Sequence, residues 1–251
     1  MTSNLRETIQ MKFAPIHTLR FMVASLGLLA ASAHASVLIN GDFETGSLSG
    51  WTITNQAGGS GNWYADTPGS TTPASGLTTS SSGGTAHGTT YAVTDQSGPG
   101  SHSLTQLFTV GSTSSALLIW DMFINNYSGS TVGTGLNFNV NPTQVGRVDI
   151  LTSTAGAFDV GTGVLQTCFL GGAPGGTPHA FSTNTCDITS SVGGGGTFQV
   201  RFGETDNQGF FNMGIDNVQI NAGTVPEPES LALVGLALAA LSLTRRKAKQ
   251  A

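Results

Sequence analysis

Basic residues are almost absent from the long middle of this sequence. Residues 36–224 contain no lysine and two arginines, Arg147 and Arg201, against eleven Asp and Glu residues. A protein that binds nucleic acid or an anionic lipid surface needs many cations to displace counterions from the phosphates. The composition therefore excludes nucleic acid and anionic lipid surfaces as partners of this region, and leaves divalent cations or neutral ligands.

The sequence also lacks the motifs of the common catalytic sites. It contains no Gly-x-Ser-x-Gly, His-Glu-x-x-His, P-loop or Gly-x-Gly-x-x-Gly pattern. A glycosidase needs two opposed carboxyl groups, and residues 36–224 hold only two glutamates, Glu44 and Glu204. His87 and His102 lie in Gly/Ser-rich stretches without an evident nucleophile. We therefore expect no enzymatic activity, and a secreted hydrolase ranks last among the functions considered.

No stretch has the length and period of an amphipathic helix, whereas short apolar runs alternate with turn residues. The runs that predict strands are residues 37–40, 51–56, 90–95, 103–110, 116–124, 135–140, 147–151, 164–170, 197–202 and 213–220. About ten strands predict one all-β domain over residues 36–224, a two-sheet, jelly-roll-like sandwich. The low-complexity stretch 57–89 predicts a long Gly/Ser/Thr-rich loop.

Cysteine is limited to Cys168 and Cys186. In an oxidising compartment this pair predicts one disulfide. On the loop-entropy model such a bridge stabilises the fold by about 3 kcal/mol. The alternative, a redox or metal-binding pair, needs further ligands nearby, and His179 alone does not supply them.

The N-terminal end indicates export. Lys12 and Arg20 precede an apolar stretch, residues 21–31, and Ala33-His34-Ala35 is a small-x-small cleavage signature. Residues 1–35 are therefore predicted to be a signal peptide, with Ser36 as the first residue of the mature chain. Met11 is an alternative start of translation.

The C-terminal end combines three elements. Val225-Pro226-Glu227-Pro228 is followed by an uncharged run rich in Leu and Ala, residues 231–243, and then by Arg245, Arg246, Lys247 and Lys249. A helix over this run would span roughly 20 Å, less than the roughly 30 Å of a bilayer hydrocarbon core. It therefore predicts a marginal, transient inner-membrane anchor with its basic tail on the cytoplasmic side. The alternative is a buried C-terminal core helix.

The order of these elements, paired with a signal peptide, resembles the PEP-CTERM proteins of Gram-negative bacteria. The resemblance implies recognition by an exosortase, a membrane transpeptidase-like enzyme that removes the tail near Val225-Pro226-Glu227-Pro228. It also implies a cell-surface or extracellular location and a link to exopolysaccharide or biofilm. It covers only residues 225–251 at this end, so it leaves the role of the middle region open.

Two stretches at the limits of the middle region resemble the galactose-binding-like jelly rolls of carbohydrate-binding modules. They are LINGDFETGSLSGWT, residues 38–52, and GIDNVQI, residues 214–220. The resemblance implies a jelly-roll fold, and a structural Ca²⁺ where the first and last strands meet.

The residues themselves support a calcium site. Asp216 has the parity of Val218 and Ile220 and is therefore expected to point toward the core, where a carboxylate needs a partner. Hard oxygen ligands favour Ca²⁺. We predict that Glu44 and Asp216 are its side-chain ligands, with Asp42 the less favoured candidate. The alternative is a half-exposed Asp216 that makes turn hydrogen bonds.

Sugar recognition needs flat aromatic surfaces beside polar groups. Trp63, Tyr64 and Tyr127 lie in or beside polar loops and are the candidate glycan-binding residues, whereas Trp51 and Trp120 lie in apolar runs and are expected in the core. Two non-catalytic functions stay open. The sorting motif favours a structural surface or matrix protein associated with exopolysaccharide, and the alternative is a carbohydrate-binding module with a specific glycan site.

Overall fold

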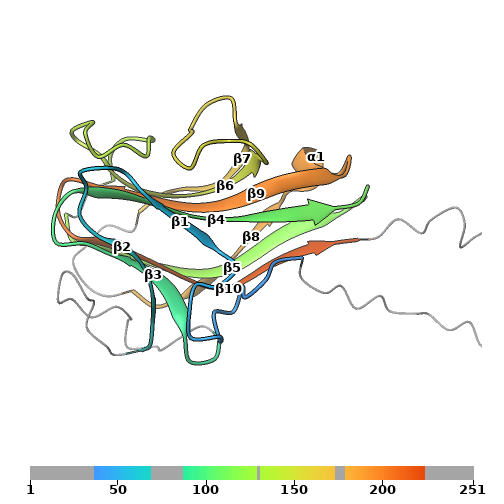
Figure 1. Ribbon diagram of the computed structural model, residues 1–251, viewed down its shortest axis with the longest axis horizontal. Coiled ribbons are helices and arrows are strands. Elements are labelled where there is room, and N and C mark those ends of the chain that lie inside the picture. The colour runs from blue at the N-terminus through green and yellow to red at the C-terminus, as the bar shows by residue number, and fades with distance from the viewer. Residues whose placement is uncertain (1–36, 69–86, 129–130, 173–178, 224–251) are drawn as a thin grey trace, which may run out of the picture. The chain divides into compact units, whose positions relative to one another are not determined.

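The computed structural model describes residues 37–68, 87–128, 131–172 and 179–223. These residues form ten strands and one short helix (Figure 1): β1 (Thr52–Asn55), β2 (Asn62–Asp66), β3 (Tyr91–Asp95), β4 (Gly100–Val110), β5 (Ala116–Asn126), β6 (Gln144–Thr152), β7 (Val164–Gly171), β8 (Ser182–Asp187), α1 (Thr189–Val192), β9 (Gly196–Asp206) and β10 (Phe211–Ala222). Within these ranges no helix is long and apolar enough to cross a membrane. The predicted signal peptide and the helix predicted over residues 231–243 lie outside the described residues.

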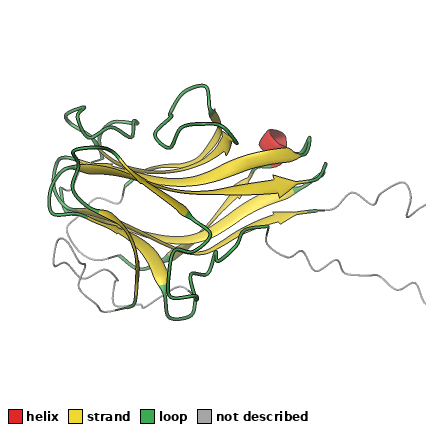
Figure 2. Cartoon of the chain, viewed as in Figure 1, coloured by secondary structure: helices red, strands yellow, loops and turns green. Residues whose placement is uncertain are grey.

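The strands form two five-stranded antiparallel sheets, stacked as two layers (Figure 2). Sheet A has the order β1-β4-β9-β6-β7 and sheet B the order β2-β3-β10-β5-β8. Without β1 and β2, the eight strands β3 to β10 form two four-stranded sheets with the orders β4-β9-β6-β7 and β3-β10-β5-β8. This connectivity is that of a jelly roll. The predicted all-β, two-sheet architecture is confirmed.

The core lies between the sheets and is built from alternate residues of each strand. Phe202 of β9 is buried there and packs edge-on against Trp120 of β5, with ring centroids 6.4 Å apart. Trp51, just before β1, lies 6.0 Å from Phe202 and 5.6 Å from Phe43. Trp51 and Trp120 are thus core residues, as the apolar runs around them predict.

Four predictions about individual elements are wrong. Residues 37–40 form bends, and residues 135–140 form turns, in which the amide of Val140 donates to the carbonyl of Asn137 at 3.1 Å. The Asn137 side chain also accepts from the amide of Asn139, so this segment follows an Asx-turn rather than a strand. Conversely, the sequence predicts no strand at β2, which lies within the predicted loop 57–89, and none at β8.

The disulfide between Cys168 and Cys186 is present. Cys168 belongs to β7, an edge strand of sheet A, and Cys186 to β8, an edge strand of sheet B. The bridge therefore joins the two sheets along one side of the sandwich.

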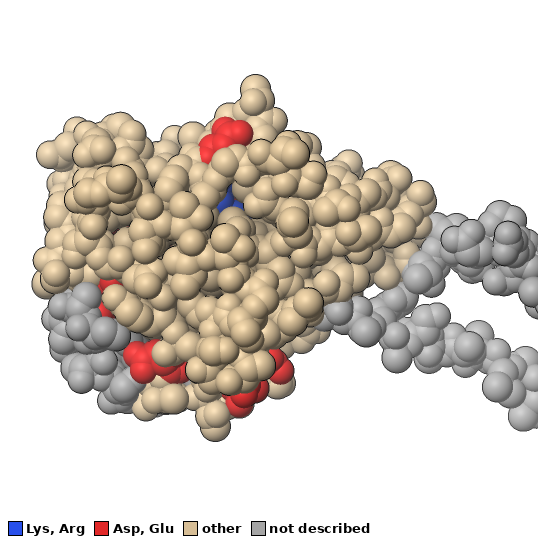
Figure 3. Space-filling view, in the orientation of Figure 1, with Lys and Arg blue, Asp and Glu red and all other residues tan. Residues whose placement is uncertain are grey.

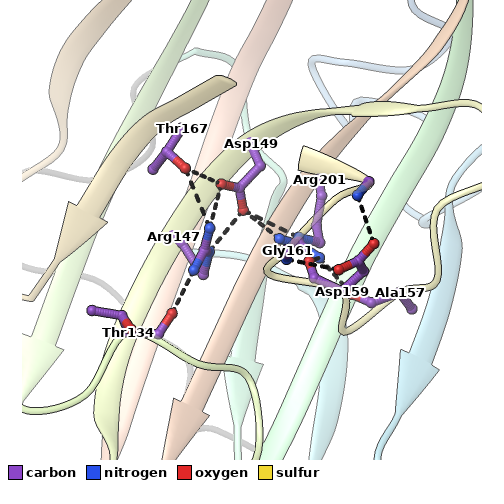
Figure 4. Close-up of polar contacts among 9 residues, drawn as sticks. Thr134, Arg147, Asp149, Ala157, Asp159, Gly161, Thr167 and Arg201 are labelled. Carbon is purple, nitrogen blue, oxygen red and sulfur yellow. Dashed lines mark hydrogen bonds and ion pairs between the residues drawn. The ribbon is translucent and has the colours of Figure 1, made fainter. Parts of the chain in front are cut away.

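Both arginines are buried on the side of sheet A that faces away from sheet B (Figure 4). Arg147 Nη2 lies 2.8 Å from Asp149 Oδ1, and Arg201 Nη2 lies 2.6 Å from Asp149 Oδ2. The Arg147 guanidinium also donates to the carbonyl of Thr134, and the Arg201 guanidinium donates to the carbonyl of Ala157 at 3.1 Å. One buried ion triad thus holds two long loops onto the sheet.

Candidate functional site

The two ends of the domain meet beside β10. The amide of Val218 donates to the carbonyl of Gly41 at 2.8 Å, and Trp51 Nε1 donates to the carbonyl of Asn40 at 3.0 Å. A Cβ atom on Gly41 would lie 2.0 Å from the Val218 carbonyl oxygen, so only glycine allows this approach. The turn at residues 40–44 is therefore fixed against the last strand, which is where the sequence predicts the calcium site.

Glu44 contacts the segment that leads into β3. Its Oε1 accepts hydrogen bonds from the amides of Thr89 at 2.7 Å and Thr90 at 2.8 Å, and its Oε2 accepts from the Thr89 hydroxyl at 3.0 Å. The bond from the Thr90 amide is the largest cause that lowers the pKa of Glu44, followed by the bond from Thr89. Glu44 is therefore a carboxylate held ionised at neutral pH.

Asp216 contacts the same segment from the other side. Its Oδ2 accepts from the amide of His87 at 3.0 Å and its Oδ1 accepts from the amide of Asn217 at 2.7 Å. Burial, together with the charges of Asp121 and Glu44, raises the pKa of Asp216 to about 7, although the hydrogen bonds from the amides of Asn217 and His87 act to lower it. The structure thus brings Glu44 and Asp216 to one short stretch, residues 87–90.

The prediction that the Asp216 side chain points toward the core is wrong. A register irregularity in the β10–β5 pairing falls between Asp216 and Gln219, and Asn217 has a φ of 49°. Asp216 therefore lies on the outer face of sheet B, opposite Asp121 of β5, while Val218 and Ile220 turn into the core. Asp216 is nevertheless buried, because the chain around His87 covers it.

The oxygen atoms around Glu44 and Asp216 meet part of what a Ca²⁺ site requires. The described ranges contain two Lys or Arg side chains, Arg147 and Arg201, and both pair with Asp149. Neither is therefore available to neutralise Glu44, Asp121 or Asp216. Glu44 and Asp216 supply hard carboxylate oxygens. The described residues nevertheless contain no group of three or more His, Cys, Asp or Glu side chains that could hold a metal ion. Backbone carbonyls would have to complete the shell.

Asp42 is exposed, and its carboxylate accepts a long hydrogen bond, 3.4 Å, from the amide of Glu44 within the turn. The view in Figure 3 shows the acidic side chains of one face as small separate patches, with little basic surface.

The three aromatic candidates occupy different environments. Trp63 is 1% exposed and belongs to the core, so no face of its indole ring is open to a ligand. Tyr64 is half-buried beside Tyr91 and Phe123 on the outer face of sheet B. Tyr127 is half-buried just after β5, and its amide donates to the carbonyl of Phe210 at 3.0 Å. Glycan binding by Tyr64 and Tyr127 stays a prediction.

A groove of about 490 Å³ lies where β5, β7 and β8 approach one another. Its lining includes aromatic and aliphatic side chains and three polar ones: Phe123, Phe169, Leu170, His179, Ser182 and Asn184. Sequence reasoning missed it, because the residues come from three separate strands and β8 itself was not predicted. The only available signal was the disulfide, which predicts that the segments around Cys168 and Cys186 lie together.

Comparison with known proteins identifies one family feature. The model of the PEP-CTERM protein-sorting motif matches residues 224–247. This match confirms the predicted sorting motif, which includes Val225, Pro226, Glu227, Pro228, Arg245 and Arg246. No curated protein matches the chain.

Among solved structures, the chain is similar to TmCBM61 in complex with beta-1,4-galactotriose, with a TM-score of 0.47 and 11% identity over 75% of this chain and 99% of that one. It is also similar to the K3 cleaved adhesin domain of Lys-gingipain from Porphyromonas gingivalis W83, with a TM-score of 0.46 and 16% identity over 75% of this chain and 99% of that one.

Proposed function

We propose that this protein is exported, processed by an exosortase, and serves a structural, non-catalytic role at the cell surface or in an exopolysaccharide matrix. The observation that carries the proposal is the sorting-motif match at residues 224–247, which begins just after β10 ends at Ala222. Cleavage near the motif would leave every strand of the sandwich intact. The near absence of basic side chains suits a protein that coexists with polysaccharide rather than binding polyanions.

Intact-mass analysis of the protein recovered from an exosortase-containing host tests this proposal. The mature chain is expected to begin at Ser36 and to lack the segment after the Pro-Glu-Pro motif. A variant with Pro226→Ala, Glu227→Ala and Pro228→Ala is expected to keep its tail, as is the wild type in a host without the exosortase. A cytoplasmic chain that retains both apolar ends would refute the proposal.

A second candidate function is glycan binding in the groove between β5, β7 and β8. It is favoured by the combination of Phe169 with the polar groups of Ser182 and Asn184 in one concave site. A glycan array probed with the mature protein would show saturable binding that Phe169→Ala and Asn184→Ala both weaken, while Leu107→Ala, at an exposed residue of β4, serves as a control outside the groove. Absence of binding to every glycan leaves the structural role alone.

We also propose that Ca²⁺ binds at Glu44 and Asp216 and ties the ends of the domain together. An ion that binds only the folded state adds about 2.7 kcal/mol at 100-fold excess over its Kd. For a domain of this size, each kcal/mol of added stability raises the Tm by roughly 2–4 °C. Chelation should therefore lower the Tm, Asp216→Ala should remove the part of this calcium response that comes from this site, and Glu44→Gln should weaken that part. A calcium-independent loss in both variants would contradict the site.

A further inference from the structure

One end of the core is polar instead of apolar. Along β9 the residues on the core side are Val200 and Phe202, followed on the same side by Glu204 and Asp206. Gln96, which follows β3, meets them from sheet B. Glu204 is 0% exposed, Gln96 is 1% exposed and Asp206 is 3% exposed. Two carboxyl groups and an amide are therefore enclosed between the sheets.

Two acceptor atoms of this cluster take part in none of its hydrogen bonds. Gln96 Nε2 donates to Glu204 Oε1 at 3.2 Å and to the carbonyl of Phe211 at 2.8 Å. This fixes the orientation of the amide, because the reverse orientation would place its oxygen against two other oxygens. Glu204 Oε2 and Gln96 Oε1 are buried and have no hydrogen-bond partner among the described residues. Unpaired buried acceptors are costly, so the cluster calls for a positively charged or donating ligand.

No basic side chain of the described residues can take that place. Arg147 and Arg201 bind Asp149 on the far side of sheet A. His102 lies on the core side of β4, but burial lowers its pKa to about 4, which keeps it neutral at physiological pH. Burial and the charge of Asp206 raise the pKa of Glu204 well above its ordinary value, and burial raises the pKa of Asp206 to about 7.

Asp206 also connects the cluster to the surface. Its Oδ1 accepts from the amide of Gly100 at 3.0 Å. It lines a surface pocket of about 190 Å³ together with Ser97, Pro99 and Phe210. The carboxyl group of Asp206 therefore lies between the enclosed pair, Gln96 and Glu204, and a pocket at the surface.

We propose that Gln96, Glu204 and Asp206 form a second Ca²⁺ site, buried between the sheets, with Glu204 Oε2, Gln96 Oε1 and the Asp206 carboxylate as ligands. The donors are all oxygen atoms, which Ca²⁺ prefers, and two of the three residues are carboxyl groups that would be ionised with the ion bound. The site differs from the one at Glu44 and Asp216, because Asp216 lies on the outer face of sheet B. Its ion would join β9 to the end of β3 across the two sheets.

Calcium content measured by elemental analysis of the purified mature protein tests the proposal directly. After dialysis against micromolar Ca²⁺, Glu204→Gln and Asp206→Asn should each contain one ion fewer per chain than the wild type. Asp187→Asn, at an exposed aspartate of β8 that belongs to neither proposed site, is the matched control and should contain as much calcium as the wild type. Equal calcium content in the wild type, Glu204→Gln and Asp206→Asn would overturn the proposal.

Thermal unfolding supplies a second, independent readout. In excess chelator Glu204→Gln should melt at a higher temperature than the wild type, because a neutral amide replaces a buried carboxyl group. In Ca²⁺ the order should reverse, because only the wild type gains from the ion. An order that is the same in both conditions would instead identify Glu204 and Asp206 as carboxyl groups that share protons, and would refute the site.

Discussion

At the scale of single residues, Asp149 shows how few charges this domain uses and how completely it buries them. Arg147 and Arg201 both donate to its carboxylate, and Thr167 Oγ1 adds a third donor at 2.8 Å. Burial works to raise the pKa of Asp149, but the hydrogen bonds from Arg147 and the charge of Arg201 outweigh it and hold the pKa below its ordinary value. The triad is therefore ionised at neutral pH, and each member depends on the others.

Asp149→Asn should destabilise the domain by about 3–5 kcal/mol, because it leaves two buried guanidinium groups without a counter-charge. Urea denaturation in the presence of chelator measures the change. Asp42→Asn, at an exposed acidic residue, is the control and should change the stability by less than about 0.5 kcal/mol. A similar small effect for both variants would mean that the triad contributes nothing.

His102 should make the domain sensitive to mild acid. Its folded-state pKa of about 4 lies below the ordinary value of 6.5, so between these values the unfolded chain binds the additional proton. Stability is therefore lost as pH falls from about 6.5 to about 4, by up to about 3 kcal/mol. The difference in unfolding free energy between the wild type and His102→Gln, measured from pH 7 to pH 4, isolates this effect because titrations common to both cancel. A difference that is independent of pH would contradict it.

At the scale of elements, apolar runs predict every strand that is paired on both sides but only two of the four edge strands, β1 and β7. The runs within β4, β5, β6, β9 and β10 are confirmed, and all of these strands are paired on both sides. The segments missed, β2 and β8, are edge strands with polar sequences whose pairing depends on one neighbour. Residues 135–140 alternate like a strand but form turns, because Asn137 bonds to the local backbone. Local hydrogen bonding and edge position are thus what periodicity fails to capture.

The bridge between β7 and β8 should stabilise the domain by about 3 kcal/mol, because it closes two edge strands from different sheets. Reduction should therefore lower the Tm of the wild type. The double variant Cys168→Ala and Cys186→Ala should already melt at the lower temperature and should not respond to reductant. A wild-type Tm unchanged by complete reduction would show that the link is dispensable.

The contact between Glu44 and residues 87–90 can be tested through glycine. A Cβ atom on Gly88, at φ 73°, would lie 2.3–2.7 Å from the Glu44 carboxyl atoms, whereas one on Gly46, at φ 71°, would meet no atom within 4 Å. Both alanine variants carry the same backbone strain, about 1 kcal/mol. Gly88→Ala should lower the Tm more than Gly46→Ala, and only Gly88→Ala should weaken the response to Ca²⁺. Equal effects would show that the Glu44 contact adds no stability.

At the scale of the whole molecule, the sandwich and the terminal segments are separable. The strand pairings, the disulfide and the ion triad described above all involve residues between 37 and 223. The sorting motif begins at residue 224, directly after the last strand. We therefore expect the domain to fold before and after removal of either end.

A chain of residues 36–224 should consequently unfold in one cooperative transition and at the same Tm as the sandwich domain of the unprocessed chain, residues 1–251. Calorimetry of the two proteins, with equal calorimetric and van't Hoff enthalpies as the criterion of a single transition, measures this. A truncated chain that aggregates or lacks a cooperative transition would show that the terminal segments contribute to the fold.

The sequence by itself determined the features that depend on order along the chain. The sorting motif, the paired cysteines, the all-β class and the scarcity of Lys and Arg between residues 36 and 224 follow from composition and short motifs. Tertiary structure alone decided where the carboxyl groups lie. The irregularity after Asp216 reverses the side of the sheet to which the following residues point, and Glu204 is enclosed only because Gln96 of the other sheet covers it. The alternation of residues along one strand predicts which side chains share a face of the sheet. The burial, pKa and ligand geometry of those side chains depend on which distant strands pack against that face.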